Sequence, residues 1–314
     1  MAQKRIVTLT INPALDRNTR IDRVSPNEKL RCEAPEREPG GGGINVSRAI
    51  RRLGGQSLAI FPCGGPIGEM FKRLLDEEGV EQRPISIEGT TRENVTVFEG
   101  SASQHYIFIM PGPELTEAEW QGTLDGVRGL DPAPDYVVAS GSCPPGVPAD
   151  FYRRAAELSQ DLGSRLIVDT SGEPLRLAAE AGVYLLKPNM RELGQLAGQE
   201  IESEEHQIEA AKELVGSGQA EVVVVSMGAG GALVVTDELG EHLRTPTVPI
   251  RSRLGAGDSM VAGIVLGLAR GKEVLDAARF GIAAGASAVM TPRTELCRRE
   301  DTERLYERLV SGEA

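Results

Sequence analysis

The sequence predicts an α/β fold in which a central, mostly parallel β-sheet is flanked by helices and a small β-sheet forms a lid. Short runs of β-branched residues recur along the chain, and stretches of helical period separate most of them. Strands and helices that alternate in this way are typical of a parallel sheet covered on both faces. We expect residues 1–314 to form a single domain around this sheet.

The predicted elements can be placed in chain order. Strands are expected at residues 6–10 (IVTLT), 57–62, 136–141, 165–169, 183–187 and 221–226. Helices are expected at residues 45–53, 67–78, 116–130, 148–162 and 206–217. The helices fall between strands, which favours crossover connections and hence parallel pairing.

Two segments, at about 15–37 and 90–111, do not follow this alternation. Both alternate polar and apolar residues and contain turn residues, which is typical of antiparallel strands with one solvated face. We expect them to join as the lid sheet. Because such a sheet would expose an apolar face, we also expect a homodimer that pairs through the lid.

The composition excludes several classes of function. A net charge of -12 disfavours a nucleic-acid surface, which needs basic clusters to neutralise phosphates. The four cysteines lie far apart without CxxC spacing, so neither a zinc site nor a disulfide framework is predicted. The N-terminal apolar stretch is too short for a signal peptide or a membrane span. We therefore expect a cytoplasmic protein without nucleic-acid or membrane partners.

The strongest chemical motif is GAGDSMVAG at residues 255–263. Gly255, Ala256 and Gly257 precede an apolar helix, so their backbone N–H groups can bind an anion at its N-terminus. Asp258 would then lie against that anion and could remove a proton from an attacking hydroxyl, as a kinase requires. Aspartate is also a favoured helix cap, so capping and catalysis both remain open for Asp258.

A second glycine run, GGGGINVSRAI, begins at Gly40. Glycines allow close approach of the backbone to a ligand, and Asn45 can donate to and accept from sugar hydroxyls. The alternative is a flexible turn with Asn45 as a helix cap, but that would not require four glycines. We favour a binding role. Neither glycine run has the GxxxxGK[ST] or GxGxxG pattern of the common nucleotide-binding motifs.

Two further segments follow predicted strands. In KPNMREL, at residues 187–193, Asn189 and Glu192 would share one face of a helix and could order a hydrated Mg²⁺. On spacing alone, a simple capped helix start is favoured there. In SMGAGGALV, at residues 226–234, the glycines could cradle a nucleotide or form a turn between two strands. From residue 226 onward, small residues at helical spacing also indicate tight helix packing.

Together these motifs resemble the ribokinase-like sugar kinases, also called the PfkB family, over essentially the whole chain. The N-terminal signature of that family is matched by Gly41, Gly42, Gly43, Asn45 and Ser47, with Gly54 and Gly64 at the expected distances. The C-terminal signature is matched by Ser252 and by residues 255–258. The resemblance implies a ribokinase-like α/β fold with a β-clasp lid, ATP as the phosphoryl donor and Mg²⁺ as the bridging metal.

The resemblance also implies a role for each matching residue. Asp258 would be the catalytic base, and Gly255, Ala256 and Gly257 would form the anion hole. The sugar phosphate would be bound by Asp16, Lys29, Arg31, Gly41, Gly42, Asn45, Arg92 and Ser142. The nucleotide and its magnesium would be bound by Lys187, Asn189, Glu192, Ser226, Gly228 and Gly231. Ser252 and Arg293 would belong to a K⁺ loop.

Within the family, EPGGGGINVSRAI looks most like the minor bacterial type of 6-phosphofructokinase. In 1-phosphofructokinases and tagatose-6-phosphate kinases a lysine typically stands among these glycines, where this chain has Gly42 or Gly43. The resemblance therefore favours phosphorylation of the C1 hydroxyl of fructose 6-phosphate, with those two activities as alternatives. In the resembling enzymes an arginine from the lid reaches across the dimer, which would suit Lys29 and Arg31.

Three other functions remain to be separated from this one. Ribose or adenosine kinases take acceptors without a phosphate, which would leave the cations Lys29, Arg31 and Arg92 unused. A sugar-phosphate sensor could keep the fold without catalysis, because fold alone does not establish activity. A Rossmann-type oxidoreductase suits the strand and helix alternation but lacks the glycine fingerprint.

Overall fold

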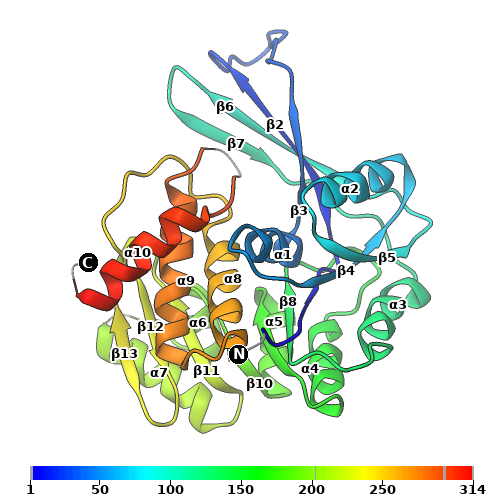
Figure 1. Ribbon diagram of the computed structural model, residues 1–314. Coiled ribbons are helices and arrows are strands. Elements are labelled where there is room, and N and C mark those ends of the chain that lie inside the picture. The colour runs from blue at the N-terminus through cyan, green and yellow to red at the C-terminus, as the bar shows by residue number, and fades with distance from the viewer. Residues whose placement is uncertain (1–2, 202, 293–294, 313–314) are drawn as a thin grey trace.

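The structure, a computed structural model, describes residues 3–201, 203–292 and 295–312 (Figure 1). Within them a nine-stranded sheet runs in the order β13-β12-β11-β10-β9-β8-β1-β4-β5, and a separate four-stranded sheet runs β3-β2-β6-β7. This arrangement confirms the predicted fold class. The larger sheet is made of β1 (Ile6–Leu9), β4 (Leu58–Cys63), β5 (Glu81–Ser86), β8 (Tyr136–Ser140), β9 (Arg165–Asp169), β10 (Val183–Leu186), β11 (Ala220–Ser226), β12 (Ala232–Val235) and β13 (Gly240–Leu243).

Pairing in the larger sheet is parallel from β11 to β5. Each of these parallel connections crosses over through a helix or through the smaller sheet. β12 and β13 pair antiparallel instead, because the connection between β11 and β12 holds only the short helix η1 (Gly228–Gly230), too short for a crossover. All the parallel strands therefore end at one edge of the sheet.

Helices cover both faces of the larger sheet. They are α1 (Gly42–Arg52), α2 (Gly65–Glu77), α3 (Glu117–Arg128), α4 (Phe151–Asp161), α5 (Gly172–Glu180), α6 (Met190–Ala197), α7 (Glu204–Gly216), α8 (Ala256–Ala269), α9 (Val274–Val289) and α10 (Arg299–Ser311). The five helices from α3 through α7 pack on one face of the sheet and form one hydrophobic core with it. Helices α1, α8 and α9 pack on the other face and form a second core. Among the residues that the structure describes, no helix is long and apolar enough to cross a membrane.

The close packing of α8 against α9 explains several of the small residues near the C-terminus. A Cβ atom at Gly263 would lie 2.7 Å from the Cα of Gly281, so the two helices approach too closely here to accommodate a side chain. α8 is apolar on all sides and almost fully buried. The predicted tight helix packing is thus confirmed for Gly263 and Gly281.

The small sheet stands apart from the main body (Figure 1) and consists of β2 (Ala14–Ile21), β3 (Glu36–Gly40), β6 (Arg92–Glu99) and β7 (Gln104–Phe108). Its strands come from the two segments that interrupt the alternation. The prediction of antiparallel strands holds within each segment but is wrong between them, because β2 and β6 pair in parallel. Both strands start at the larger sheet and run outward, and this common direction makes their pairing parallel.

We expect Gly263→Ala to destabilise the protein by roughly 1–3 kcal/mol, because the new methyl group would overlap the facing helix. Chemical denaturation of the purified variant measures this change. Gly216→Ala is the matched control, since a Cβ at this glycine in α7 meets no atom within 4 Å. That variant should be neutral or slightly stabilising. Equal losses in both variants would contradict the packing argument.

Candidate active site

The polar residues of the candidate site gather at the edge where the parallel strands end. β9 ends at Asp169 and β10 is followed directly by Lys187. The glycine loop before α1 and the start of α8 lie over the same edge, because Asn45 of α1 donates a hydrogen bond to Asp258 of α8. In open α/β sheets this edge is where ligands bind.

Asp258 does not cap its helix. The N-cap of α8 is Gly255, which adopts a left-handed conformation with φ of 72° and makes no side-chain cap bond. Asp258 is the third residue of the helix, and its Oδ2 accepts a hydrogen bond from Asn45 Nδ2 at 2.9 Å. The capping alternative for Asp258 is therefore wrong, and the carboxylate lies in the first turn, where backbone N–H groups are free for an anion.

The environment of Asp258 favours its neutral form. Burial and the nearby charge of Asp169 raise its pKa from 3.8 to about 7, against the opposing effects of Asn45 and Lys187. A carboxyl group with a pKa near neutrality is suited to exchange protons with a hydroxyl group. The side chain is half-buried, so a substrate can still reach it.

Lys187 and Asp169 form a buried ion pair beside α8. Lys187 Nζ lies 3.1 Å from Asp169 Oδ1, and only 6% of the residue is exposed. A Cβ atom at Gly257 would lie 3.9 Å from Lys187 Nζ, which places the ammonium group next to the first turn of α8. Burial is the largest single effect and lowers the pKa of Lys187, but the charge and hydrogen bond of Asp169 together with the charges of Asp258 and Glu192 outweigh it, so the net pKa is raised. The lysine therefore stays charged where phosphates would lie.

The glycine run at the start of α1 permits contacts that other residues would block. Gly41 is the N-cap of α1, with φ of 109°, a conformation that favours glycine. A Cβ at Gly42 would overlap Ser140 Oγ at the end of β8. Asn45 lies in the fourth position of α1, so the alternative that it caps the helix is wrong. Its side chain is directed across the site to Asp258 instead.

Asp16 and Arg92 lie at the base of the small sheet. Asp16 pairs with Asn94 across β2 and β6, and Asn94 Nδ2 donates to Asp16 Oδ1 at 2.8 Å. Burial raises the pKa of Asp16, against the hydrogen bond from Asn94 and the charges of Arg48 and Arg92. Both predicted residues thus face the site from neighbouring strands.

Asn12 connects these residues to the larger sheet. Its backbone oxygen accepts from Arg92 at 3.0 Å, and its Nδ2 donates to Ser142 Oγ at 3.2 Å. The buried atoms Asn12 Oδ1, Thr10 Oγ1 and Arg92 Nε have no hydrogen-bond partner among the described residues. Buried polar groups normally bond to protein, water or a ligand, and other unpaired buried atoms, such as Gln82 Oε1 and Gln207 Oε1, lie away from this position.

Lys29 and Arg31 are not part of this arrangement. Both are exposed and belong to the irregular connection between β2 and β3 at the outer end of the small sheet (Figure 1). This connection returns to β2 where Glu33 N donates to Arg20 O. A strand rises about 3.3 Å per residue, so Arg20 lies roughly 13 Å beyond Asp16. The structure therefore separates both cations from the site of their own chain.

On the nucleotide side, Asn189 caps α6 and forms a capping box with Glu192. Asn189 Oδ1 accepts from Glu192 N at 2.9 Å, and Glu192 Oε2 accepts from Asn189 N at 2.8 Å. The capped helix start favoured from spacing is confirmed. An isolated bridge joins Asn189 to Ser226 at the end of β11, so two predicted nucleotide residues are adjacent.

The SMGAGG segment is a turn between two antiparallel strands. Met227 N donates to Gly231 O at 2.9 Å, and a Cβ at Gly231 would overlap Leu243 O. Gly231 is thus required by the turn itself. Gly228 is exposed, and a Cβ there would meet no atom within 4 Å, so its surface is open to a ligand.

Comparison with protein families identifies the chain. The model for "pfkB family carbohydrate kinase" matches residues 9–301. The chain belongs to the pfkB family of carbohydrate kinases. This family assignment confirms the resemblance carried by the two glycine motifs, and it makes the chain a kinase rather than an oxidoreductase.

The curated relatives of this kinase include two 6-phosphofructokinases. The ATP-dependent 6-phosphofructokinase isozyme 2 of Mycobacterium tuberculosis is 48% identical over 303 residues, with 96% of this chain and 89% of that protein covered. The Escherichia coli enzyme of the same name is 42% identical, with 96% and 98% covered. A 1-phosphofructokinase of Bacillus subtilis is more distant, at 34% identity with 91% and 93% covered.

Solved structures of Escherichia coli phosphofructokinase-2 share the fold of this kinase. The complex with potassium has a TM-score of 0.94 at 42% identity, covering 98% of this chain and 99% of that one. The complex with fructose 6-phosphate has a TM-score of 0.92 at 41% identity, with the same coverage. A tetrameric inhibited form of the same enzyme also matches, with a TM-score of 0.92, 41% identity and the same coverage.

The two residues predicted for a K⁺ loop are only partly described in this kinase. Ser252 is buried, and its backbone N–H and that of Arg251 both donate to Val289 O, which joins the segment before α8 to the end of α9. Arg293 lies outside the described residues. Leu296, further along the same connection, packs against Gly255 at the start of α8.

Several residues that the structure brings to the candidate site were missed by sequence reasoning. Asp169 ends a predicted strand at the ligand edge of the sheet, and that position was the signal that could have identified it. Asn12 follows the first strand in the same way. Asn94 and Arg48 carried no such signal, because their importance depends on pairing across the small sheet and on a buried ion pair.

The raised pKa of Asp258 predicts an unusual effect on stability. A carboxyl group that binds its proton more tightly in the folded state destabilises that state once it ionises. We expect Asp258→Asn to be more stable than the parent by roughly 2–4 kcal/mol at about pH 8, and by about half as much near pH 5.5. Urea unfolding of both proteins at the two pH values measures the difference.

The matched control for this measurement is Asp237→Asn, which removes an exposed carboxylate from the turn between β12 and β13. It should change the free energy of unfolding little. A loss of stability in Asp258→Asn at about pH 8 would contradict the raised pKa.

Proposed function

We propose that this kinase transfers the γ-phosphoryl group of ATP to the C1 hydroxyl of fructose 6-phosphate, forming fructose 1,6-bisphosphate. The observation that carries the proposal is the position of Asp258 in the first turn of α8, with a pKa near 7 and a hydrogen bond from Asn45. The 6-phosphofructokinases at 42–48% identity support this acceptor, and the 1-phosphofructokinase is less similar.

In this reaction Asp258 accepts the proton of the C1 hydroxyl while the hydroxyl oxygen attacks the γ-phosphorus in line. The bond from the γ-phosphorus to the bridging oxygen breaks, and ADP leaves. The free N–H groups at Gly255, Ala256 and Gly257 stabilise the charge on the transferring group, as donors at a helix N-terminus do for anions. Asn45 fixes the direction of the Asp258 carboxylate.

The sugar phosphate would bind between the glycine run and the base of the small sheet. Asp16 and Asn45 can bind sugar hydroxyls, and Arg92 supplies a cation for the phosphate. Gly41 and Gly42 let the sugar approach the backbone, and Ser142 adds a hydroxyl from the loop after β8. The unpaired buried atoms of Thr10, Asn12 and Arg92 support a polar ligand there.

ATP would bind on the other side of Asp258. Lys187 provides the charge that meets its phosphates, and Asn189, Ser226, Gly228 and the turn held by Gly231 line the approach. Mg²⁺ would be held by Glu192 through water, and among the described residues no group of three or more metal-ligating side chains occurs. Such water-rich coordination is usual for Mg²⁺ with phosphates, whose charge the ion neutralises.

Two further properties belong to the proposal. A K⁺ ion would act near Ser252, supported by the potassium complex of the Escherichia coli relative and by the contact of this segment with the end of α9. The enzyme would work in the cytoplasm, where ATP and sugar phosphates are metabolised.

The decisive experiment is ADP release from Mg-ATP with fructose 6-phosphate, fructose 1-phosphate, tagatose 6-phosphate and fructose compared side by side. We expect fructose 6-phosphate to give the highest kcat/KM, with an acidic limb in its pH profile near pH 7. Asp258→Asn should lose at least about 100-fold in kcat while still binding ATP.

Other outcomes would correct specific parts of the proposal. Preference for another phosphosugar would keep the mechanism and change the acceptor. Turnover of Asp258→Asn close to that of the parent would overturn the assignment of the base. Tight binding of fructose 6-phosphate without turnover would make the protein a sensor.

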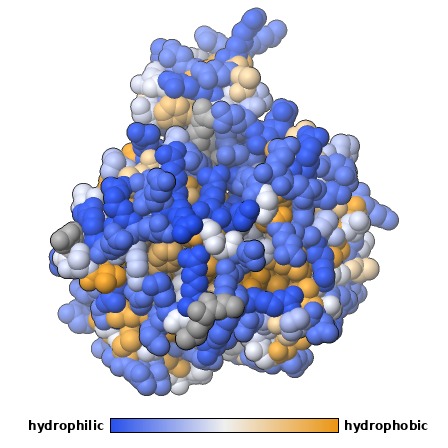
Figure 2. Space-filling view, viewed as in Figure 1, coloured by the Kyte–Doolittle hydropathy of each residue, from blue (hydrophilic) through white to orange (hydrophobic). Residues whose placement is uncertain are grey.

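We also propose that the small sheet pairs two copies of the chain. Val95 and Phe108 are cross-strand partners on β6 and β7, and Val97 shares their face, away from Asn94 and the site. The exposed apolar residues of this sheet and its connections are Leu30, Ile107, Phe108, Ile109 and Met110, and Figure 2 shows scattered orange atoms among blue ones in this part of the molecule. Ile107 pairs with Thr96 and so lies on the face of the site, whereas Phe108 lies with Val95 on the outer face. Pairing would cover this surface and bring Lys29 and Arg31 of one copy towards the site of the other.

We expect Phe108→Asp to halve the molar mass measured by light scattering at micromolar concentration, because a buried charge is costly in an apolar interface. KM for fructose 6-phosphate should rise as the partner's cations are lost. Val310→Asp is the matched control, since Val310 is 58% exposed on α10, far from the small sheet. An unchanged mass for Phe108→Asp would contradict pairing through this face.

A further inference from the structure

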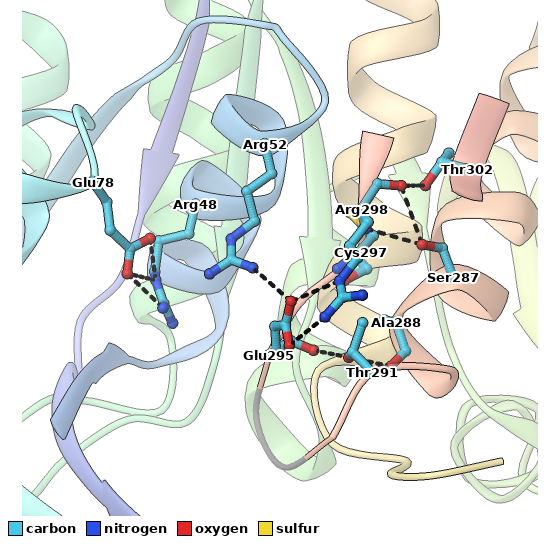
Figure 3. A network of polar contacts seen from close by, with 11 residues as sticks. Arg48, Arg52, Glu78, Ser287, Ala288, Thr291, Glu295, Cys297, Arg298 and Thr302 are labelled. Carbon is cyan, nitrogen blue, oxygen red and sulfur yellow. Dashed lines mark hydrogen bonds and ion pairs between the residues drawn. The ribbon is translucent and has the colours of Figure 1, made fainter. Parts of the chain in front are cut away.

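Two arginines on α1 lie one helical turn apart and point to different partners (Figure 3). Arg48 reaches Glu78, which follows α2, whereas Arg52 reaches Glu295 at 3.9 Å, in the segment before α10. Only Arg48 is fully buried, with 2% of the residue exposed. A buried arginine this close to an active site needs a physical account.

Arg48 is surrounded by acceptors that use most of its guanidinium. Its Nε lies 2.9 Å and 3.0 Å from the two carboxylate oxygens of Glu78, and Nη2 lies 2.6 Å from Glu78 Oε1. Its Nη1 donates to Pro39 O at 2.7 Å, at the end of β3. The same Nη1 donates to Asn45 Oδ1 at 3.4 Å. These bonds fix the guanidinium against α1, β3 and the end of α2.

The contact between Arg48 and Asn45 favours one orientation of the Asn45 amide. A guanidinium has donors and no acceptor, so only the amide oxygen of Asn45 can face it favourably. The amide nitrogen must then point the other way, and it donates to Asp258 Oδ2 at 2.9 Å. If the amide were reversed, its oxygen would face the Asp258 carboxylate and its NH₂ would face Arg48, and both hydrogen bonds would be lost.

We propose that Arg48 is a positioning residue for catalysis, which acts by holding the Asn45 amide in the one orientation that donates to Asp258. Glu78 keeps Arg48 in place. The inference rests on the proposed role of Asp258 as the base, and it adds a chain of contacts from Glu78 through Arg48 and Asn45 to that carboxylate. No atom of Arg48 needs to touch the substrate.

The groups around Asp258 determine how its pKa depends on the orientation of the Asn45 amide. Asp169 and Asp16 raise the pKa of Asp258, and Lys187 and the hydrogen bond from Asn45 lower it. If the hydrogen bond from Asn45 is lost, only Lys187 still opposes the rise in the pKa of Asp258 that burial and the two aspartates cause. The carboxylate should then hold its proton to a higher pH.

A stability role is the simpler alternative, and the choice of variants separates it from positioning. Removing only one partner of a buried ion pair leaves an uncompensated charge and can prevent folding. The test variant is therefore Arg48→Met combined with Glu78→Gln, which removes both charges together. Arg52→Met is the control, because it removes an arginine and an ion pair from the same helix without touching Asn45.

The measurement is the pH profile of kcat/KM for fructose 6-phosphate, together with kcat and KM for ATP at the optimum. We expect the double variant to lose roughly 10–100-fold in kcat, as losses of supporting contacts often do. Its acidic limb should move to higher pH, and its KM for ATP should stay near that of the parent. Arg52→Met should keep the position of the acidic limb.

The same pair of substitutions is then made in an Asn45→Ala background. Because Arg48 acts through Asn45, the two substitutions should not move the acidic limb of the pH profile any further when Asn45 is already alanine. An unmoved limb in the folded double variant, or an equal further shift in the Asn45→Ala background, would overturn the inference. If Asp258→Asn itself keeps its turnover, the base assignment fails first, so the two failures are distinguishable.

Discussion

The burial of one carboxylate at the start of α8 is the constraint on which the site depends. Asp258 lies where free backbone N–H groups attract an anion, yet burial and Asp169 make its ionised form costly, so its pKa lies near 7. The opposing contributions come from Asn45 and from Lys187, on different elements. Small shifts of α1 or β10 against α8 would therefore change the proton affinity of Asp258.

The packing of the helices protects this geometry from such shifts. α8 and α9 pack backbone to backbone through glycines and share one hydrophobic core, so a shift of either helix would open a gap in that core. α1 belongs to the same core, and the Arg48 and Glu78 pair ties it to the end of α2. Arg48 is buried and Glu78 is partly exposed, and such a pair contributes little to stability when compared with apolar packing, which is consistent with the positioning role proposed for Arg48.

Much of the fold and part of the site follow from local sequence, and the remainder depends on long-range contacts. The parallel sheet, the glycine start of α8 at Gly255 and the glycine run before Asn45 are visible as patterns within a few residues. The bond between Asn45 and Asp258 joins positions 213 residues apart, so no local pattern reveals it. The parallel pairing of β2 with β6 was missed for the same reason, because strand direction is set by where both strands leave the larger sheet.

The small sheet reverses the usual distribution of polar and apolar residues on a two-faced sheet. Asn94 and Thr96 are buried on the face directed to the site, whereas Val95 and Val97 lie on the other face. A sheet that covered a hydrophobic core would have the opposite pattern. The alternation is confined to the middle of β6, because Phe98 shares the face of Asn94, and Glu93 on the outer face forms an ion pair with Arg17. The two polar residues of the inner face are suited to the proposed sugar phosphate, and the two valines of the outer face are suited to the proposed pairing of two chains.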